Sequence, residues 1–157
     1  MVNEPTVLLE NVKITLKNFS GVPDKFNKNG HRTFAVLLDD EIADEMARDG
    51  WLIKQFKQKD PGEPPQSFIK VRVRFGTKIP RVVMITSRGR TTLTDEEDLK
   101  LLDWADIRMV DIILRPNDWE MDGKTGRKAY LKSMFATIEE DALERKYADV
   151  PEAGEED

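Results

Sequence analysis

The chain has 157 residues, of which 39% are hydrophobic and 35% charged, with no cysteine and a single histidine. This length suffices for one domain with a sizeable core and is too short for two full domains. Without thiols or an imidazole cluster, a zinc finger and cysteine catalysis are excluded, and no run of about 18 apolar residues predicts a membrane span. The N-terminus has neither a basic start nor an apolar segment, so we expect a cytoplasmic protein.

Charge is distributed unevenly along the chain, whose formal net charge is −5. Residues 51–94 hold ten Lys and Arg against two acidic residues, a net charge of +8, so the rest of the chain carries −13. Separation of this kind is typical of a protein that binds a polyanion on one surface and repels it elsewhere.

The N-terminal third of the chain predicts a hairpin and a helix. Alternating apolar and polar residues favour a long strand over 7–19, and Asn29-Gly30 suits a tight turn into a second strand over 32–38. Residues 39–49 predict a helix that stops at Gly50, followed by a strand over 51–56. Proline and glycine make 60–65 a loop, because they cannot continue the interior of a sheet.

A basic stripe is predicted on the next strand. Apolar residues at positions 69, 71, 73 and 75 alternate with Lys70, Arg72 and Arg74. Successive side chains of a strand point to opposite faces, so the three cations share one face and the apolar set shares the other.

The remaining elements are a strand over 81–86, a helix that a capping box at 94–97 opens, and a hairpin. Leu99 and Leu102 face inward from the helix, and the hairpin joins strands 107–115 and 127–138 through residues 122–126. A short helix is expected over 139–147. Beyond Ile138, nine acidic residues stand against two basic ones. We therefore expect a domain over 1–149 and a disordered acidic tail over 150–157.

This order of elements predicts a mainly β fold: an OB-fold-like five-stranded barrel with extra strands and two to three short helices. An OB-fold has a helix before its last two strands, where residues 94–105 fall. The helix over 39–49 is then an insertion. Such barrels commonly bind single-stranded nucleic acid across one face.

Binding of a single strand requires cations that follow the phosphates and aromatic rings on which bases stack. The aromatic candidates are Trp51, Trp119 and Tyr130, for which packing in the core is the alternative role. The cationic candidates are Lys54, Lys57, Lys70, Arg72, Arg74, Arg81, Arg88, Arg90, Lys128 and Lys132. For the Lys- and Arg-rich strand, the alternative is a solvated edge that discourages aggregation.

If the protein is an enzyme, its catalytic groups must be carboxylates. Asp118 and Glu120, with Lys124 nearby, faintly suggest a metal-dependent nuclease, but they border a hairpin turn, where such residues are ordinary. The lone His31, beside Gly30, is interpreted as an exposed turn residue. We expect no cofactor, no metal and no catalytic residue.

Several short runs between residues 11 and 149 carry a family likeness. They are Asn18-Phe19-Ser20-Gly21 with Phe26-Asn27 and Gly30-His31-Arg32, the helix from Asp39-Asp40-Glu41 to Asp49-Gly50-Trp51, the runs 115–119 and 123–132, and Ile138-Glu139-Glu140-Asp141 with Lys146-Tyr147. Together they resemble a family of bacteriophage single-stranded-DNA-binding proteins. The resemblance implies a non-catalytic OB-fold protein that coats single strands during phage replication or recombination in the infected host.

Proteins of this functional class often carry an acidic C-terminal tail that occupies the binding groove and recruits phage or host replication proteins. Glu152, Glu155, Glu156 and Asp157 look like such a tail. Several such tails end in an aromatic residue, which this chain lacks, so competition with DNA carries over more safely than docking to a host partner. The alternative is a phage structural or assembly protein whose basic face binds an acidic protein. The sequence does not decide whether the nucleic acid is DNA or RNA.

Overall fold

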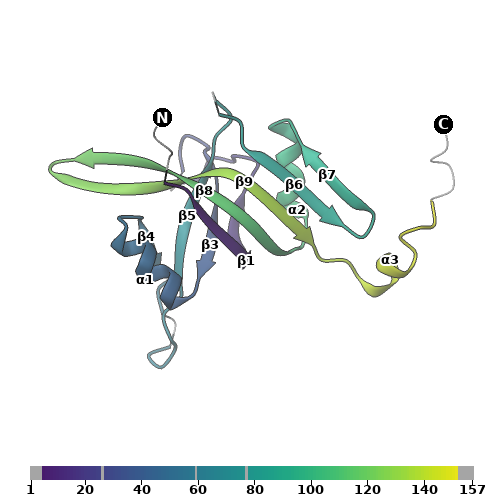
Figure 1. Ribbon diagram of the computed structural model, residues 1–157, viewed down its shortest axis with the longest axis horizontal. Helices are drawn as coiled ribbons and strands as arrows, with labels where there is room; N and C mark the ends of the chain where they lie inside the picture. The colour runs from purple at the N-terminus through teal and green to yellow at the C-terminus, as the bar shows by residue number, and fades with distance from the viewer. Residues whose placement is uncertain (1–4, 26, 59, 77, 152–157) are drawn as a thin grey trace.

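The computed structural model describes residues 5–25, 27–58, 60–76 and 78–151, which form a mainly β protein (Figure 1). The strands are β1 (Val7–Val12), β2 (Ile14–Asn18), β3 (Arg32–Leu38), β4 (Ile53–Gln55), β5 (Ser67–Val73), β6 (Arg81–Thr86), β7 (Gly89–Leu93), β8 (Ile107–Met121) and β9 (Lys124–Ile138). The helices are α1 (Asp40–Arg48), the 3-10 helix η1 (Glu97–Lys100), α2 (Leu101–Trp104) and α3 (Ala142–Lys146).

All the strands belong to one sheet with the order β1-β8-β9-β5-β3-β2. The two ends of this order, β1 and β2, are consecutive in the chain with only Lys13 between them, so the sheet curves back on itself. The parallel pairing of β5 with β9 joins its two halves. The additional strands are β4, beside β5, and the β6–β7 pair, beside β9. The predicted mainly β fold with extra strands and short helices is confirmed, and the nine strands of the described residues form one open sheet.

The single strand expected over 7–19 is divided in two. Register shifts lie between Leu9 and Val12 and between Thr15 and Asn18, and Asn11 and Leu16 have positive φ values of 54° and 52°. Bulges of this kind bend a strand and increase its twist. The bends allow one stretch of chain to pair first with β8 and then with β3.

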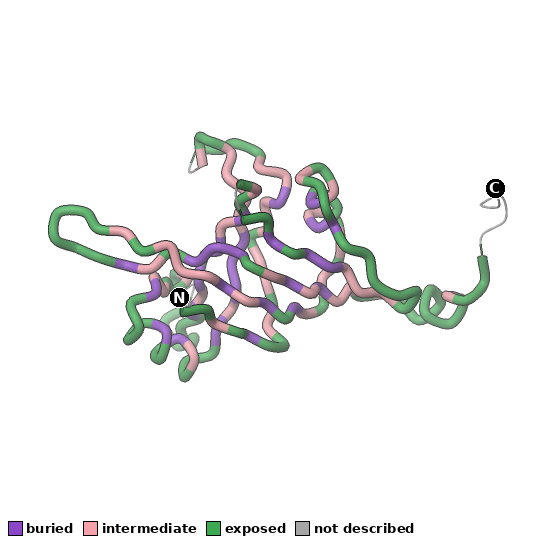
Figure 2. The backbone as a smooth tube through the Cα atoms, turned by 45° about the horizontal axis from the view of Figure 1, so that its top comes forward, coloured by how far each residue is buried: buried purple, intermediate pink, exposed green. Residues whose placement is uncertain are grey.

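The core lies inside the curved sheet (Figure 2). Ile69, Val71 and Val73 of β5 are buried in it, while Lys70 and Arg74 are exposed and Arg72 is half-buried, as the period of the strand predicted. Leu99 and Leu102 are also buried, as expected.

Helix α1 begins and ends as the sequence predicted. The Asp39 side chain accepts a hydrogen bond from the Ile42 amide, and Gly50 follows with a φ of 92°. The prediction of a capping box at 94–97 is wrong, because no side chain caps the N-terminus of η1 or of α2. Instead, Asp103 accepts hydrogen bonds from the Phe19 and Ser20 amides and so anchors this segment to the end of β2.

The last hairpin is longer than predicted and projects from the body of the protein (Figures 1 and 2). Its turn consists of Asp122 and Gly123 alone, with φ values of 52° and 79°, and pairing resumes at once between Met121 and Lys124. A two-residue turn with both φ values positive matches the twist of antiparallel strands, so the polar flanks continue the ladder.

The chain ends beyond the hairpin with α3, inside the range expected for a helix. The predicted tail residues Glu152, Glu155, Glu156 and Asp157 lie outside the described residues. Among the helices described, none is long and apolar enough to cross a membrane.

Candidate nucleic-acid interface

A row of polar side chains crosses the outer face of four strands. Thr33 of β3 pairs with Arg72 of β5, Arg72 pairs with Tyr130 of β9, and Tyr130 pairs with Arg115 of β8. Residues that are far apart in the sequence thus meet on one surface. The pairing of Lys128 with Asn117 forms a second row beside the first.

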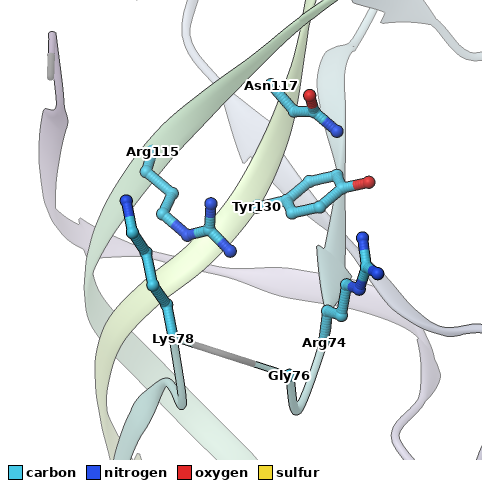
Figure 3. A pocket seen from close by; sticks show the side chains of 6 residues that line it. All are labelled: Arg74, Gly76, Lys78, Arg115, Asn117 and Tyr130. Atoms are coloured by element: carbon cyan, nitrogen blue, oxygen red, sulfur yellow. The ribbon is translucent and has the colours of Figure 1, made fainter.

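Tyr130 lies between two guanidinium groups. The central guanidinium carbon of Arg72 is 5.8 Å from the ring centroid. That of Arg115, which Figure 3 shows beside the ring, is 5.2 Å from it. Burial by itself raises the pKa of the Tyr130 hydroxyl, but a hydrogen bond with Asn117 and the charges of Arg72 and Arg74 outweigh it and lower the pKa. Tyr130 is only 6% exposed, so its ring is not the open stacking surface that the sequence predicted.

Two hollows meet at Tyr130 and together form what we call the cationic groove. One has a volume of about 290 Å³ and the other about 330 Å³. The cations that line them are Lys54, Lys70, Arg72, Arg74, Lys78, Arg115 and Lys128. In the part of the chain that the structure describes, no carboxylate lines either hollow. This distribution gives the groove a uniformly positive potential, which favours a polyanion.

His31 lies in this groove and is half-buried, so its interpretation as an exposed turn residue is wrong. Its Nδ1 is 2.9 Å from a guanidinium nitrogen of Arg72. Asn27 holds the His31 backbone through two hydrogen bonds. Burial and the charges of Arg72 and Lys70 lower the pKa of His31. The neutral ring therefore accepts a hydrogen bond from Arg72, because a guanidinium can only donate.

Two of the predicted aromatic residues pack within the protein. Trp51 is 3% exposed and belongs to the core, so the prediction that it stacks on bases is wrong. Trp119 is half-buried opposite Gly126, where an added Cβ would come within 2.8 Å of its Nε1 and 3.0 Å of Leu52. Its Nε1 is buried and has no hydrogen-bond partner among the described residues.

Several predicted cations lie outside the groove. Arg81 sits over the Phe135 ring at 5.2 Å, and Arg88 forms an ion pair with Glu144 at 3.9 Å. Arg90, on β7, is exposed and lines neither hollow, and the same holds for Lys57. Lys132 is the extra residue where the register shifts between β8 and β9, so the expected face shared by Lys128, Tyr130 and Lys132 is interrupted there.

Sequence reasoning missed Arg115 and Asn117 as groove residues, and the strand that it predicted ended at residue 115. The period-2 pattern that places Arg115, Asn117 and Trp119 on one face was the signal that could have found them. The side chains of Arg115 and Asn117 lie beside Tyr130 (Figure 3).

The geometry suits the binding of phosphates. Lysine and arginine side chains neutralise phosphates, and guanidinium planes stack on bases of any kind.

Asp118, a candidate nuclease residue, forms an ion pair with Arg127 at 3.2 Å. Within the described ranges, no group of three or more His, Cys, Asp or Glu side chains is placed to hold a metal ion.

Comparisons with known proteins identify the family of the chain and relatives of its fold. A family model described as "Putative phage ssDNA-binding domain" matches residues 2–157. The fold resembles the single-stranded DNA-binding protein from bacteriophage Enc34 with its C-terminus truncated, at a TM-score of 0.56 and 16% identity over 87% of each chain. The same Enc34 protein in complex with ssDNA gives a TM-score of 0.54 and 15% identity over 87% of this chain and 88% of that chain. The search of curated proteins found no match.

Proposed function

Because the chain belongs to the family of putative phage ssDNA-binding domains, we propose that it is a non-catalytic protein that binds single-stranded DNA with little sequence preference. It coats the strand during phage replication or recombination in the cytoplasm of the infected host. The observation that carries the proposal is the cationic groove, which is lined from β3, β4, β5, β8 and β9 and, among the described residues, by no carboxylate. A structural relative from Enc34 was determined with ssDNA bound.

The chemistry of the groove supports binding without sequence preference. Contacts to phosphates carry no sequence information. Stacking on a guanidinium plane is also tolerant of sequence, because every base has a π-face. The hydrogen bond from Arg72 to His31 and the contact of Arg115 with Tyr130 fix the two guanidinium groups before DNA arrives. Such fixed positions reduce the entropy that binding costs.

The test is a salt titration of binding to a labelled oligothymidylate, followed by fluorescence anisotropy. If roughly 4–6 phosphates are contacted at about 0.7 per contact, log affinity falls with log salt at a slope of about −3 to −4. Duplex binds more weakly. An affinity that does not depend on salt, or a preference for duplex, contradicts the groove as the site.

Two triple variants identify the surface that binds. Lys70→Gln, Arg72→Gln and Arg74→Gln together remove groove cations, and we expect weaker binding to every sequence and a salt slope reduced by about 2. The matched control changes Arg81, Arg88 and Arg90 to Gln, which removes the same charge outside the groove and should have a much smaller effect. Equal losses for the two variants would show that net charge, and not the groove, governs binding. If the protein instead has an acidic protein as its partner, oligonucleotide binding will be absent in the unmodified chain.

A further inference from the structure

Leu16 is held on the outer surface by an unfavourable backbone conformation. Its φ of 52° is in the left-handed region, which a bulky side chain rarely adopts, and its side chain is 62% exposed. The register shift between Thr15 and Asn18 marks the bulge at this position. A strained backbone and an exposed leucine both disfavour the folded state. Glycine or asparagine would fit this backbone better, so folding alone does not account for a leucine here.

Leu16 lines a hollow of about 510 Å³ that continues the cationic groove. Val22, which is 60% exposed, and Phe68 line the same hollow. Lys54 and Lys70 line both this hollow and the groove beside it. An apolar surface is thereby placed directly beside two ammonium groups.

Phe68 contributes an aromatic ring to this surface. It stands two residues before Lys70 on β5, so the two side chains share the outer face of the strand. Its ring stacks on that of Phe56, with the centroids 4.2 Å apart and the planes at 21°. The stack fixes the orientation of Phe68 while the ring still lines the hollow.

We infer that this hollow binds one unpaired nucleobase of the bound strand, with Leu16 and Phe68 contacting the base and Lys54 and Lys70 contacting its flanking phosphates. We call it the base site. The inference rests on the proposed function, because the base belongs to the strand whose phosphates lie in the cationic groove. A nucleobase joins an apolar face to a phosphate a short distance away, which is the combination that these four side chains offer. Bases in a duplex are stacked and paired, so the base site also favours single strands.

The decisive variant is Leu16→Gly, because folding and binding should respond in opposite directions. Glycine adopts the left-handed conformation without strain, so the melting temperature should stay the same or rise. The affinity for oligothymidylate should fall about fivefold as the apolar contact is lost. The matched control is Asn11→Gly, which changes the left-handed residue of β1, at a φ of 54° and outside the lining of the hollow. Its affinity should stay unchanged.

An abasic oligonucleotide, which keeps the phosphates and lacks the bases, separates the base site from the groove. The unmodified protein should bind it more weakly than oligothymidylate, and Leu16→Gly should bind it as tightly as the unmodified protein does. The base site is overturned if Leu16→Gly loses the same affinity for the abasic oligonucleotide as for oligothymidylate, or if it loses no affinity for oligothymidylate. If the unmodified protein binds oligothymidylate with the expected salt dependence in that experiment, the groove function stands. If it binds neither strand, the proposed function itself fails.

Discussion

At the scale of single residues, the ring of Tyr130 separates two guanidinium groups that would otherwise repel each other. Arg72 and Arg115 approach the ring at 5.8 and 5.2 Å. Contacts of this kind are worth about 0.5–1 kcal/mol when exposed and about 2 kcal/mol when desolvated. The hydroxyl group contributes separately, through Asn117 and Arg74. Ring and hydroxyl can therefore be tested independently.

Tyr130→Phe keeps the ring and removes the hydroxyl, so we expect it to lower the free energy of unfolding by about 1 kcal/mol and leave binding nearly unchanged. Tyr130→Ala removes the buried ring, and we expect a loss of about 3–5 kcal/mol of stability together with a large loss of affinity. Urea denaturation and anisotropy with labelled oligothymidylate measure the two effects. Normal binding by a folded Tyr130→Ala protein would remove the residue from the site.

We expect His31 to make the affinity for DNA depend on pH. Its pKa in the free protein lies below the ordinary value of 6.5, since burial, Arg72 and Lys70 disfavour the imidazolium. The other ionisable groups that line the same hollow as His31 are Lys54, Lys128 and Tyr130. A bound phosphate opposes these charges and raises the pKa again. The complex then holds a proton more readily than the free protein, so affinity should increase as the pH falls below about 6.5.

The control for this proton linkage is His31→Gln, which keeps an acceptor for Arg72 and does not titrate. Its affinity should vary less with pH over the range from about 7 to 5.5. Stability should change in the opposite direction from binding in the unmodified protein. The unfolded chain takes up the proton first, at a pKa near 6.5, so the free energy of unfolding falls as the pH falls through and below this value. Identical pH profiles for the two proteins would exclude His31 as the linked group.

At the scale of elements, the connection between α1 and β4 is attached to the long hairpin. The amide of Arg127 donates to the Gly50 carbonyl at 2.8 Å, and its carbonyl accepts from the Leu52 amide at 3.0 Å. Trp51, between these two contacts, fills the core. The inserted helix thereby supports the base of the hairpin, whose strands carry Arg115, Asn117 and Lys128 into the groove.

Gly126→Ala tests this support. An added Cβ would lie 2.8 Å from Trp119 Nε1 and 3.0 Å from Leu52, so we expect a loss of about 1–3 kcal/mol in the free energy of unfolding. Gly62→Ala is the control, since no heavy atom is near its Cβ position and its φ is not in the left-handed region. It should be neutral or slightly stabilising.

A double variant shows whether the indole is the group that resists the added methyl. Combining Gly126→Ala with Trp119→Leu should cost less than the sum of the two single changes, because the smaller side chain leaves room for the methyl group. Additive losses, measured by urea denaturation, would show that the strain arises elsewhere in the hairpin.

At the scale of the whole molecule, acidic residues near the C-terminus contact cations that lie outside the cationic groove. Near the C-terminus, Glu140 accepts hydrogen bonds from Ser87, and Glu139 and Glu144 form ion pairs with Arg108 and Arg88. The acidic residues of this end thus neutralise cations outside the groove. Exposed ion pairs of this kind contribute little stability, so their main effect is on the distribution of charge.

The acidic tail is expected to compete with DNA for the groove. Removing residues 151–157 deletes Glu152, Glu155, Glu156 and Asp157 and changes the net charge from −5 to −1. A tethered polyanion has a high effective concentration at a cationic surface, so its removal should raise the affinity for single strands most at low salt. Equal affinities of the full-length and shortened chains at low salt would refute this competition.

The sequence by itself determined the features that depend on local chemistry. The alternation in β5 predicted its basic face, the cap at Asp39 and the stop at Gly50 predicted α1, and the uneven charge predicted a polyanion partner. These signals lie within a few residues of the chain, where side-chain periodicity and backbone preference act directly. The limits of the last hairpin were missed because the polar residues around its turn carry no apolar alternation.

Which of these residues meet depends on how distant segments of the chain pack together. The pairing of Arg72 with Tyr130 joins β5 to β9, the burial of Trp51 depends on the hairpin that covers it, and the outward turn of Leu16 follows from the bulge in β2. Each depends on packing between segments distant in the chain, and the free energy of that packing is not contained in any local pattern. For this reason the positive charge of the site was readable from the sequence, whereas the groove and the base site were not.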